Sequence, residues 1–394
     1  MTKLTWQALL AASLLTGCTD VLGLKMSTAH DFKESQDADI TPSPDTATAS
    51  ADTAPASVDT AGPPSTANGV TIHWMSNGTT SSFFDTSRSG ANLAAQELTN
   101  SSGMNVNLSI TDPANNQAAT QAQRIRDAIA ARVNAIAIDV IDATVIGPEI
   151  DAAANQGITV LTFDSDAPGS KRISYYSIDN YASGVVAAKI LTSLMGSNGG
   201  NIAIMNKENP PTAANFMARR DGFVAELEKH AGFKVVTDLP CTDGPTGEST
   251  LQAGCTGVLE SAMIAHPEIT GWFLSRGRIL RETDLATKAP NWTAKIKSGA
   301  FFAVSYDAIP ESLANIQAGY VNAVINQKYF GWGYDVVKLL FDIVTKKRSS
   351  INPFTDSGFD IVCANNIGQV SDAWTRRNFS KPIDKCALAG QQWP

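Results

Sequence analysis

The feature of this chain that most constrains its fold is a regular alternation of short apolar runs with longer amphipathic stretches between residues 70 and 346. The short runs predict buried strands, and the stretches between them carry apolar residues at helical spacing. The predicted strands span residues 70–75, 105–110, 135–139, 159–164, 201–205, 234–239, 271–274, 302–306 and 321–326. The predicted helices span residues 84–98, 116–132, 144–155, 180–194, 212–230, 251–266, 310–318 and 331–346. Repeated strand–helix units of this length predict an α/β fold whose parallel sheets are covered by helices on both faces.

The N-terminus predicts export. Lys3 precedes an apolar run over residues 6–15, which is too short to span a bilayer and is typical of a secretory signal peptide. The run ends in Leu-Thr-Gly-Cys at residues 15–18, which matches a bacterial lipobox, whose cysteine receives a diacylglycerol before everything ahead of it is removed. An ordinary signal peptide with a chance Gly-Cys pair is the alternative. We expect residues 1–17 to be removed, leaving a periplasmic or cell-envelope lipoprotein anchored in the membrane through Cys18.

Residues 18–68 predict a disordered tether. From about residue 27 they are mostly Thr, Ala, Ser, Pro and Asp, so almost no apolar surface is available to offset the entropy lost on ordering. A flexible chain of about fifty residues has an end-to-end distance on the order of 40 Å. Residues 69–394 have ordinary globular composition and are long enough for two domains or lobes. The formal net charge of −8, without a basic stripe, argues against a nucleic-acid partner.

The cysteines agree with an exported protein. With Cys18 lipidated, four remain, and an even number in an exported chain indicates disulfides. Three pairings are possible, and we expect the two local ones, which join Cys241 to Cys255 and Cys363 to Cys386. A metal site is the weaker interpretation, because there is no CxxC spacing and the four histidines form no HxxxH or HExxH pattern. The sequence therefore predicts neither a metal nor a cofactor.

Hydrogen-bonding residues stand at the ends of several predicted strands. Asp139 ends the third strand, Asp164 and Asp166 lie at the end of the fourth, and Asp307 and Gln327 directly follow the last two. Right-handed crossovers bring the carboxyl ends of parallel strands to one edge, where open α/β sheets bind ligands. Any single Asp is equally well explained as the cap of the next helix. Several from different strands predict a binding site.

Six short segments of the chain match a known family. They are Ser-Ser-Phe-Phe (81–84), ITVLTFDSDAP (158–168), YSIDNYASG (176–184), NFMARRDGF (215–223), VSYDAIP (304–310) and VINQKYFGWG (324–333). Together they resemble the type I periplasmic binding proteins for sugars, the ribose- and galactose-binding group, over nearly all of residues 69–356. Their order and spacing, more than any one of them, carry the similarity.

The resemblance implies two Rossmann-like lobes with parallel sheets, joined by a three-crossing hinge and closing on a sugar. One lobe would comprise residues 69–178 and 328–356. The other would comprise residues 179–327, with the tail 357–394 pinned to it by a disulfide. The usual partner of such a protein is an inner-membrane ATP-driven permease (an ABC transporter), and for some members it is a receptor. We expect a monomer that binds its ligand without catalysis.

A sugar offers apolar faces to aromatic rings and hydroxyl pairs to charged planar groups. By the resemblance, Phe84 would stack on the sugar with Phe83 beside it, in a turn that includes Ser81. Arg219 would donate to two hydroxyl groups, with Asn215 near it. The remaining matches are acceptors or amides at strand ends: Asp139, where the family often has Asn, Asp164, Asp307 and Gln327. The phenylalanine pair as simple core and Arg219 as an exposed helix residue are the alternatives.

The chain departs from the family's pattern at several positions. Ser165 stands where ribose binders have Arg, and the roles of Asp166 and Arg172 just beyond it are open. Arg276 stands where the family has Asn. This extra cation would suit an acidic or phosphorylated sugar, but we expect it to pair with Asp139 or Asp166, because opposite charges in a cleft usually neutralise each other.

Other classes of function fit less well. A hydrolase would need a nucleophile and a base, but there is no Gly-x-Ser-x-Gly motif and no His near a candidate Ser. A glycosidase could use two of the aspartates, which hydroxyl binding already explains. A repressor of this fold would need an N-terminal helix-turn-helix, and the lipobox and tether stand there instead. A surface sensor remains an alternative to a transport protein.

Overall fold

The computed structural model describes residues 62–78, 82–113, 117–207, 214–241, 248–370 and 383–393. They belong to one compact unit that begins at Asp59. The predicted signal peptide, Cys18 and most of the predicted tether lie outside the described residues. Residues 62–68, the end of that tether, are held against the first lobe, because Asn134 donates to the carbonyls of Pro64 (3.2 Å) and Ser65 (3.1 Å). Within the described ranges, no helix has the length and apolarity needed to cross a membrane.

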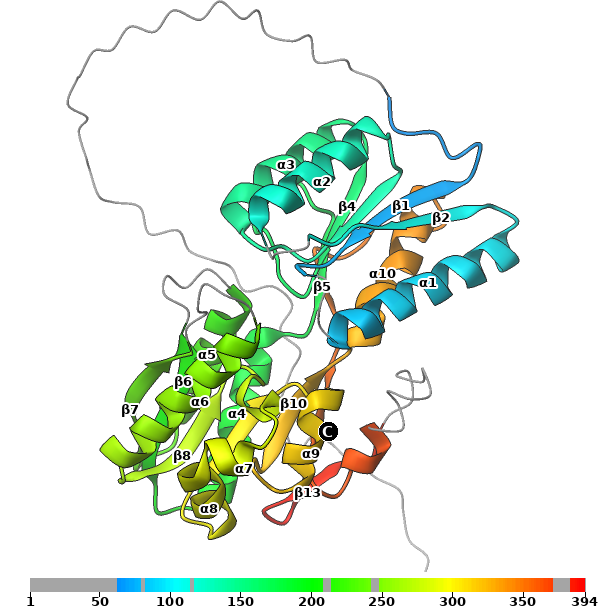
Figure 1. Cartoon of the computed structure of the whole chain (residues 1–394). Helices are drawn as coiled ribbons and strands as arrows, with labels where there is room; N and C mark the ends of the chain where they lie inside the picture. Colours follow the sequence, from blue (N-terminus) through cyan, green and yellow to red (C-terminus); the bar gives the residue numbers. More distant parts are fainter. Residues whose placement is uncertain are drawn as a thin grey trace, which may run out of the picture. The chain divides into compact units, whose positions relative to one another are not determined.

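The first lobe is a six-stranded sheet with helices on both faces (Figure 1). Its strand order is β11-β5-β4-β3-β1-β2, and the paired strands run parallel. The strands are β1 (Val70–Met75), β2 (Val106–Ile110), β3 (Ala135–Ile138), β4 (Thr159–Phe163), β5 (Ser174–Ser177) and β11 (Phe354–Asp356). Helices α1 (Ser82–Ser102) and α10 (Tyr329–Val344) pack together on one face, and α2 (Ala118–Ala130) and α3 (Ala143–Asn155) on the other.

The second lobe repeats this plan. Its strand order is β12-β10-β9-β8-β6-β7. The strands are β6 (Gly200–Lys207), β7 (Phe233–Pro240), β8 (Ile269–Leu274), β9 (Phe302–Tyr306), β10 (Ala323–Gln327) and β12 (Phe359–Val362). Helices α4 (Asn180–Met195) and α5 (Ala214–Leu227) cover one face. The other face carries α6 (Glu248–Ala265), the 3-10 turn η1 (Ile279–Arg281), α7 (Leu285–Lys288), α8 (Pro290–Lys297) and α9 (Pro310–Gln317).

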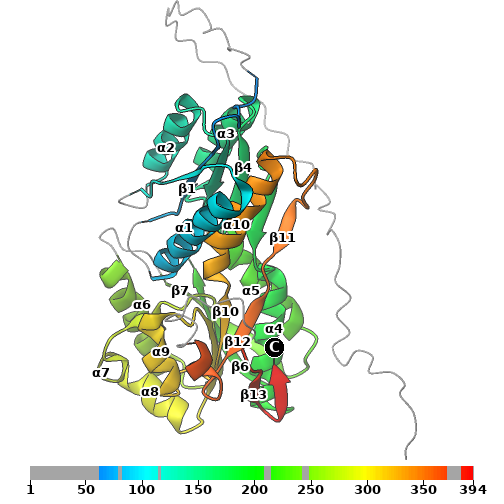
Figure 2. The same ribbon diagram turned by 90° about the vertical axis from the view of Figure 1, so that its right-hand side faces the viewer.

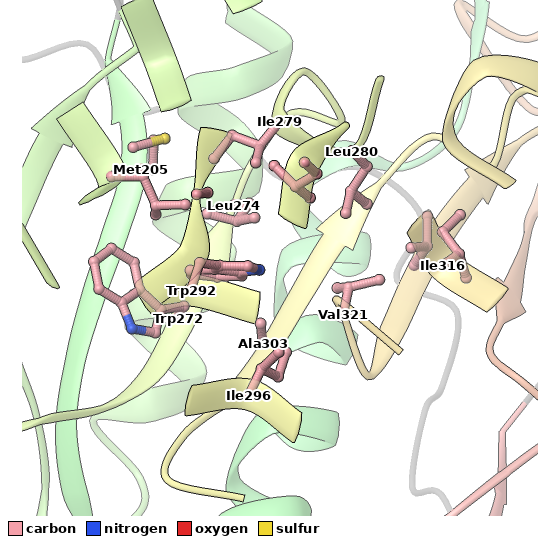
Figure 3. Packing of buried hydrophobic residues seen from close by; sticks show 14 of the residues in the cluster. Met205, Trp272, Leu274, Ile279, Leu280, Trp292, Ile296, Ala303, Ile316 and Val321 are labelled. Atoms are coloured by element: carbon pink, nitrogen blue, oxygen red, sulfur yellow. The ribbon is translucent and has the colours of Figure 1, made fainter. Parts of the chain in front are cut away.

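Alternation along the strands explains the two faces. In β6, Ile202 and Ile204 pack with α4 and α5, whereas Ala203 and Met205 pack with the helices of the opposite face. Figure 3 shows this second face, where the rings of Trp272 and Trp292 meet edge to face at 5.5 Å between centroids. A central strand such as β6 is thus apolar on both sides, which is why the sequence shows continuous apolar runs at such strands.

Local sequence fixes where several helices begin. Asp142 caps α3, since its carboxylate accepts from the backbone N–H groups of Thr144 and Val145. Asp179 caps α4 in the same way, accepting from Ala182 N at 2.8 Å. Pro310 occupies the first turn of α9, where a missing N–H costs nothing. The cap of α4 sets the position of Asn180, which lies in the candidate site.

The chain crosses between the two sheets at three places, from β5 to α4, from β10 to α10 and from β11 to β12 (Figure 2). The predicted parallel sheets are confirmed, with one antiparallel pair at an edge, where β12 pairs with β10. The reason is the direction of the crossings. The chain leaves the second sheet through β10 and returns to it through β12, so the two strands run in opposite directions.

Some elements were not predicted. Strand β5 reads Ser-Tyr-Tyr-Ser and lacks the apolar run of the others, and η1, α7 and α8 fall in a segment with no clear period. In the tail, β13 (Cys386–Leu388) and β14 (Gln391–Trp393) form an antiparallel hairpin. Its turn residues Ala389 (φ 52°) and Gly390 (φ 74°) both have positive φ, as a type I′ turn requires.

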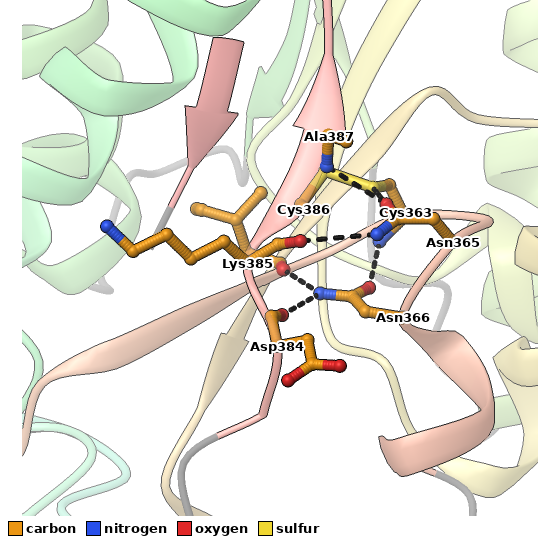
Figure 4. The surroundings of a disulfide bond; sticks show 8 residues. Cys363, Asn365, Asn366, Asp384, Lys385, Cys386 and Ala387 are labelled. Carbon is orange, nitrogen blue, oxygen red and sulfur yellow. Dashed lines mark hydrogen bonds between the residues drawn. A yellow bond between two sulfur atoms is a disulfide. The ribbon is translucent and has the colours of Figure 1, made fainter. Parts of the chain in front are cut away.

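Both predicted disulfides are confirmed, joining Cys241 to Cys255 and Cys363 to Cys386. Figure 4 shows how two asparagines reinforce the second one. Asn366 donates to the Asp384 carbonyl at 2.8 Å, and Asn365 accepts from the backbone N–H of Ala387 at 3.0 Å. The returning tail buries Trp393 in the α4–α5 face of the second lobe. The disulfide and these bonds attach the tail to that lobe.

Candidate functional site

The candidate site lies at the carboxyl ends of strands from both sheets. In the first sheet, Asp139 follows β3 and Asp164 follows β4. In the second sheet, Arg276 comes two residues after β8, Asp307 follows β9 and Gln327 ends β10. This is the edge at which open α/β sheets bind ligands. The strand ends predicted from the sequence are therefore brought to the edges where a ligand is expected.

Asp164 and Asp307 share an uncommon backbone conformation. Their φ angles are 56° and 71°, in the left-handed region that Asp tolerates better than most residues. The turn at Asp307 also needs Gly277, since a Cβ there would lie 2.4 Å from the carbonyl oxygen of Tyr306. This close approach lets Gly277 N donate to Asp307 Oδ2 at 3.3 Å. In both lobes the chain turns sharply and presents a carboxylate directly after a buried strand.

The carboxylate of Asp307 is held by several donors. Its Oδ1 accepts from the hydroxyl of Tyr329 at 2.6 Å and from Gln327 Nε2 at 3.1 Å. Gln327 is 4% exposed, and its Oε1 has no hydrogen-bond partner among the described residues. A buried amide oxygen without a donor is costly. Gln327 therefore offers an acceptor to a ligand while its other end fixes Asp307.

Arg219 is 1% exposed and is oriented by neutral groups. Its Nε donates to Asn180 Oδ1 at 2.8 Å and its Nη1 to the Ser275 carbonyl at 3.1 Å. The guanidinium lies over the ring of Tyr306, 4.1 Å from the centroid. No carboxylate among the described residues comes within the 4.0 Å of an ion pair with Arg219. The charge is thus positioned without being neutralised by a direct partner.

Arg276 occupies a different environment from the one expected. Its guanidinium lies 3.9 Å from the ring centroid of Phe216, a residue of α5. Burial, and then the charge of Arg278, lower the pKa of Arg276 to about 9, against the charge of Asp307. The expected pairing with Asp139 or Asp166 does not occur among the described residues. The ring of Phe216 and the charge of Asp307 are among the groups that surround Arg276.

Asp166 is engaged by another cation. Arg172 Nη2 donates to its Oδ2 at 2.6 Å, and Thr162 Oγ1 donates to its Oδ1 at 2.6 Å. Both carboxylate oxygens are therefore used within the first lobe. Arg172 and Asp166, whose roles the sequence left open, form an internal ion pair, and we omit Asp166 from the proposed ligand contacts.

Asp139 and Asp164 are neighbouring carboxyl groups in unlike environments. Asp139 is fully buried, and its oxygens accept from the backbone N–H groups of Asn77 and Ser165, each at 3.3 Å. Burial, and then the charge of Asp164, raise the pKa of Asp139 well above its usual range. Burial raises the pKa of Asp164 to about 7, against the charge of Arg219. The carboxylate of Asp164 accepts no hydrogen bond from any residue in the described part of the chain.

Comparison with known proteins agrees with this architecture. A model of the periplasmic binding protein domain matches residues 72–348. The chain belongs to the periplasmic binding protein family. The fold is the type I arrangement of two α/β lobes with mostly parallel sheets, as expected from the sequence.

Solved structures support the same assignment. An ABC transporter solute-binding protein from Burkholderia graminis C4D1M, in complex with D-arabinose, is 25% identical with a TM-score of 0.66. The similarity covers 76% of this chain and 96% of that one. A carbohydrate transporter solute-binding protein from Agrobacterium radiobacter, also with D-arabinose, shares the fold at 24% identity and a TM-score of 0.63, over 77% of this chain and 98% of that one.

A curated relative is the xylose/arabinose-binding protein XylF of Sulfolobus acidocaldarius. It is 26% identical over 232 residues, which is 55% of this chain. The match spans 53% of the relative, about half of its length.

The remaining predicted ligand contacts of this periplasmic binding protein lie in different surroundings from one another. Phe84 is 2% exposed and packs in the apolar cluster of α1 and α10, 6.3 Å from the ring of Trp332. Asn215 is buried in the first turn of α5, where its Oδ1 accepts from Phe216 N. Ser81 and the side chain of Phe83 lie outside the described residues. The stacking role of the phenylalanines therefore stays a prediction.

Sequence reasoning missed residues that orient the binding groups. Asn180 connects Arg219 to the hydroxyl of Tyr175, and Tyr329 fixes Asp307. Phe216 lies against both buried arginines. Asn180 and Tyr329 do lie inside segments that carry the family resemblance, directly beyond strands that cross between the lobes. A search for polar residues at the crossings would have found them.

Proposed function

We propose that this periplasmic binding protein captures a monosaccharide or related polyol between its two lobes and delivers it to an ABC permease. The observation that carries the proposal is a set of buried and half-buried polar groups near the strand ends that retain hydrogen-bonding capacity. Asp164 and Gln327 Oε1 are acceptors for hydroxyl groups, and Arg219 is an oriented cationic donor. Relatives solved with D-arabinose make a pentose the first ligand to test.

The proposed contacts have distinct tasks. Asp164 and Gln327 accept from hydroxyl groups, and Arg219 donates to a neighbouring pair of them. Arg276 and Asn215 lie at the same edge, and Asp307 holds Gln327 in place while its remaining lone pairs face the ligand. A hydrogen bond to a charged group contributes about 1.5–3 kcal/mol. A few of them, made from both lobes, suffice for specific binding of a small polyol.

Binding from both lobes implies closure. We assign residues 69–178 and 328–356 to one lobe, and residues 179–327 with the tail 357–394 to the other. The chain segments that cross between the sheets would absorb the rotation as a ligand draws the lobes together. The hydroxyl of Tyr329 bonds Asp307 directly after the second crossing, so ligand contact and hinge position are coupled there.

We place the protein in the periplasm or cell envelope, anchored through a lipid on Cys18, with an inner-membrane permease as its partner. A membrane receptor that senses the closed form is the alternative partner. We propose no catalysis, because Asp307 is occupied by donors that fix it for hydroxyl binding. Hydrolysis of a labelled glycoside would overturn that part of the proposal.

The experiment is a thermal-shift screen of the purified protein against D-arabinose, D-xylose, D-ribose, D-allose, D-glucose, D-galactose, uronic acids and polyols. A ligand that binds only the folded state raises the melting temperature. We expect at least one of these compounds to do so, and Arg219→Ala and Asp307→Ala to abolish the shift in variants that still melt cooperatively. No shift with any member of the panel, or full affinity in both variants, would contradict the proposal.

A further inference from the structure

The two carboxyl groups at the ends of β3 and β4 follow neighbouring strands of one sheet. These strands are parallel neighbours, paired as far as Ile138 with Thr162. Asp139 follows the first strand and Asp164 the second, and Asp139 Oδ1 accepts from the backbone N–H of Ser165, the residue after Asp164. The backbone itself therefore brings the two carboxyl groups into one small polar region.

No cation neutralises this pair directly. Within the described ranges, neither carboxyl group lies within 4.0 Å of a Lys, Arg or His nitrogen. In the same lobe, the guanidinium of Arg172 is bound to Asp166. Arg219 bonds Asn180 and Ser275 and acts on Asp164 only through longer-range charge.

Two adjacent buried carboxyl groups cannot both ionise at low cost. Asp139 is fully enclosed, and the pKa of Asp139 is raised well above its usual range by burial and by the charge of Asp164. Asp164 is partly exposed, and its pKa is about 7. Because Asp139 is the more deeply buried of the two, we expect Asp164 to lose its proton first as the pH rises.

We propose that Asp139 is a positioning residue that keeps its proton in the working site. Of the pair, only Asp164 is then ionised and accepts hydrogen bonds from ligand hydroxyl groups. This inference rests on the proposed function. Asp139 then serves as an uncharged group, and it affects the ligand only through its effect on Asp164.

A dependence of binding on pH follows. A hydroxyl donor prefers the ionised form of Asp164, so affinity is high above pH 7 and falls as the pH drops through 7. Binding below pH 7 releases the Asp164 proton to the solvent. The other titratable groups that interact with Asp164 are Arg219 of α5, Asp307 beyond β9, Tyr329 of α10, and Tyr175 of β5, whose hydroxyl donates to the Asp164 carbonyl. Burial raises the pKa of Tyr175 far above this range.

Calorimetric titration of D-arabinose, or of the tightest binder in the sugar panel, at pH values from 5.5 to 8.0 tests this dependence. A group with a pKa of about 7 is only about 3% ionised at pH 5.5, so affinity is expected to be about 30-fold lower there than at pH 8.0. Asp164→Asn should flatten the profile. Equal wild-type affinity at the two ends of the range would overturn the inference.

Asp139→Asn tests which group holds the proton. Replacing a protonated carboxyl by an uncharged amide leaves the midpoint of the pH profile within about 0.3 units, whatever the absolute affinity becomes. If Asp139 is ionised near neutral pH, removing its charge will move the midpoint to lower pH by more than about half a unit, which would contradict the inference. Asp127→Asn, on the exposed face of α2, controls for the loss of one acidic group.

Carbon-13 NMR of the aspartate carboxyl groups gives a readout without ligand. Asp139 should be protonated at pH 7.5, and Asp164 should titrate near 7. Ionised Asp139 at that pH would overturn the inference even if sugars bind. If no sugar binds but the two carboxyl groups titrate as stated, the proposed function fails and the assignment of the proton stands.

Discussion

At the scale of single residues, the site is organised by what each polar group already binds. Asp307 is fixed by three donors, Asp166 is bound to Arg172, and the carboxylate of Asp164 accepts no hydrogen bond from the described residues. Arg219 is oriented by neutral acceptors and an aromatic face, so its charge remains available. Residues that look equivalent in the sequence therefore have different capacities to bind a ligand.

Arg219→Lys tests the importance of the planar guanidinium. Lysine keeps the charge but cannot bond Asn180 and Ser275 while donating to two hydroxyl groups. We expect ligand affinity to fall by about 10- to 100-fold, equivalent to one charge-assisted hydrogen bond. Arg220→Lys is the matched control, because Arg220 is partly exposed and paired with Asp238. Calorimetry that finds equal affinity in the two variants would contradict the role given to Arg219.

Strand-end positions could be read from the sequence, and the partners of those residues could not. Asp164, Asp307 and Gln327 directly follow apolar runs, so their place at the sheet edge follows from topology. The pairing of Asp166 with Arg172 depends on the path of a loop, which no periodicity reports. The bond from Asn180 to Arg219 joins residues 39 positions apart and depends on how α4 and α5 cross.

At the scale of elements, the close crossing of α4 and α5 supports the site. A Cβ at Gly184 of α4 would lie 1.9 Å from the carbonyl oxygen of Arg219 in α5. The two helices can approach this closely only because residue 184 has no side chain. The packing of one glycine thus sets the position of the arginine proposed to bind the ligand.

Gly184→Ala should force α4 and α5 apart. We expect a loss of about 3 kcal/mol or more in the free energy of unfolding, together with weaker ligand binding, because Arg219 moves with its helix. Gly254→Ala in α6 is the control, since a Cβ there meets no atom within 4 Å. That change should stabilise the protein by about 0.5–1 kcal/mol. Chemical denaturation measures both, and equal stabilities would refute this view of the helix crossing.

The tail offers a second test at this scale. The Cys363–Cys386 disulfide closes a loop of 23 residues and attaches the β13–β14 hairpin to the second lobe. Replacing both cysteines by serine should lower the free energy of unfolding by about 2–4 kcal/mol. Ligand affinity should change little, because the disulfide lies in the α4–α5 face cluster and not at the strand ends. A large loss of affinity with intact stability would show that the tail takes part in binding.

Elements with a clear sequence pattern were predictable, and elements without one were not. Strand β9 and the start of α9 match the prediction, because an apolar run and an N-terminal proline mark them clearly. Strand β5 and helix α7 are four residues each and are held by their neighbours, not by their own sequence pattern. The antiparallel edge at β12 follows from the order of the crossings, which local sequence does not encode.

At the scale of the whole molecule, the proposed site takes residues from two similar lobes. Their elements also meet elsewhere: Ser82 Oγ of α1 donates to Glu311 Oε2 of α9 at 2.6 Å, and Ile309 packs in the apolar cluster of α1 and α10. The tethered, exported protein that we propose would carry a sugar between its two lobes, and a membrane partner would recognise the sugar-bound form.

The measurement that tests this account most directly is calorimetric titration of the tightest sugar in the panel into the wild-type protein and into one variant from each lobe. Asp164→Ala removes an acceptor of the first lobe and Arg219→Ala a donor of the second. We predict one binding site per protein and a loss of at least about tenfold in affinity in each variant. Wild-type affinity in either variant would show that the two lobes do not share the ligand.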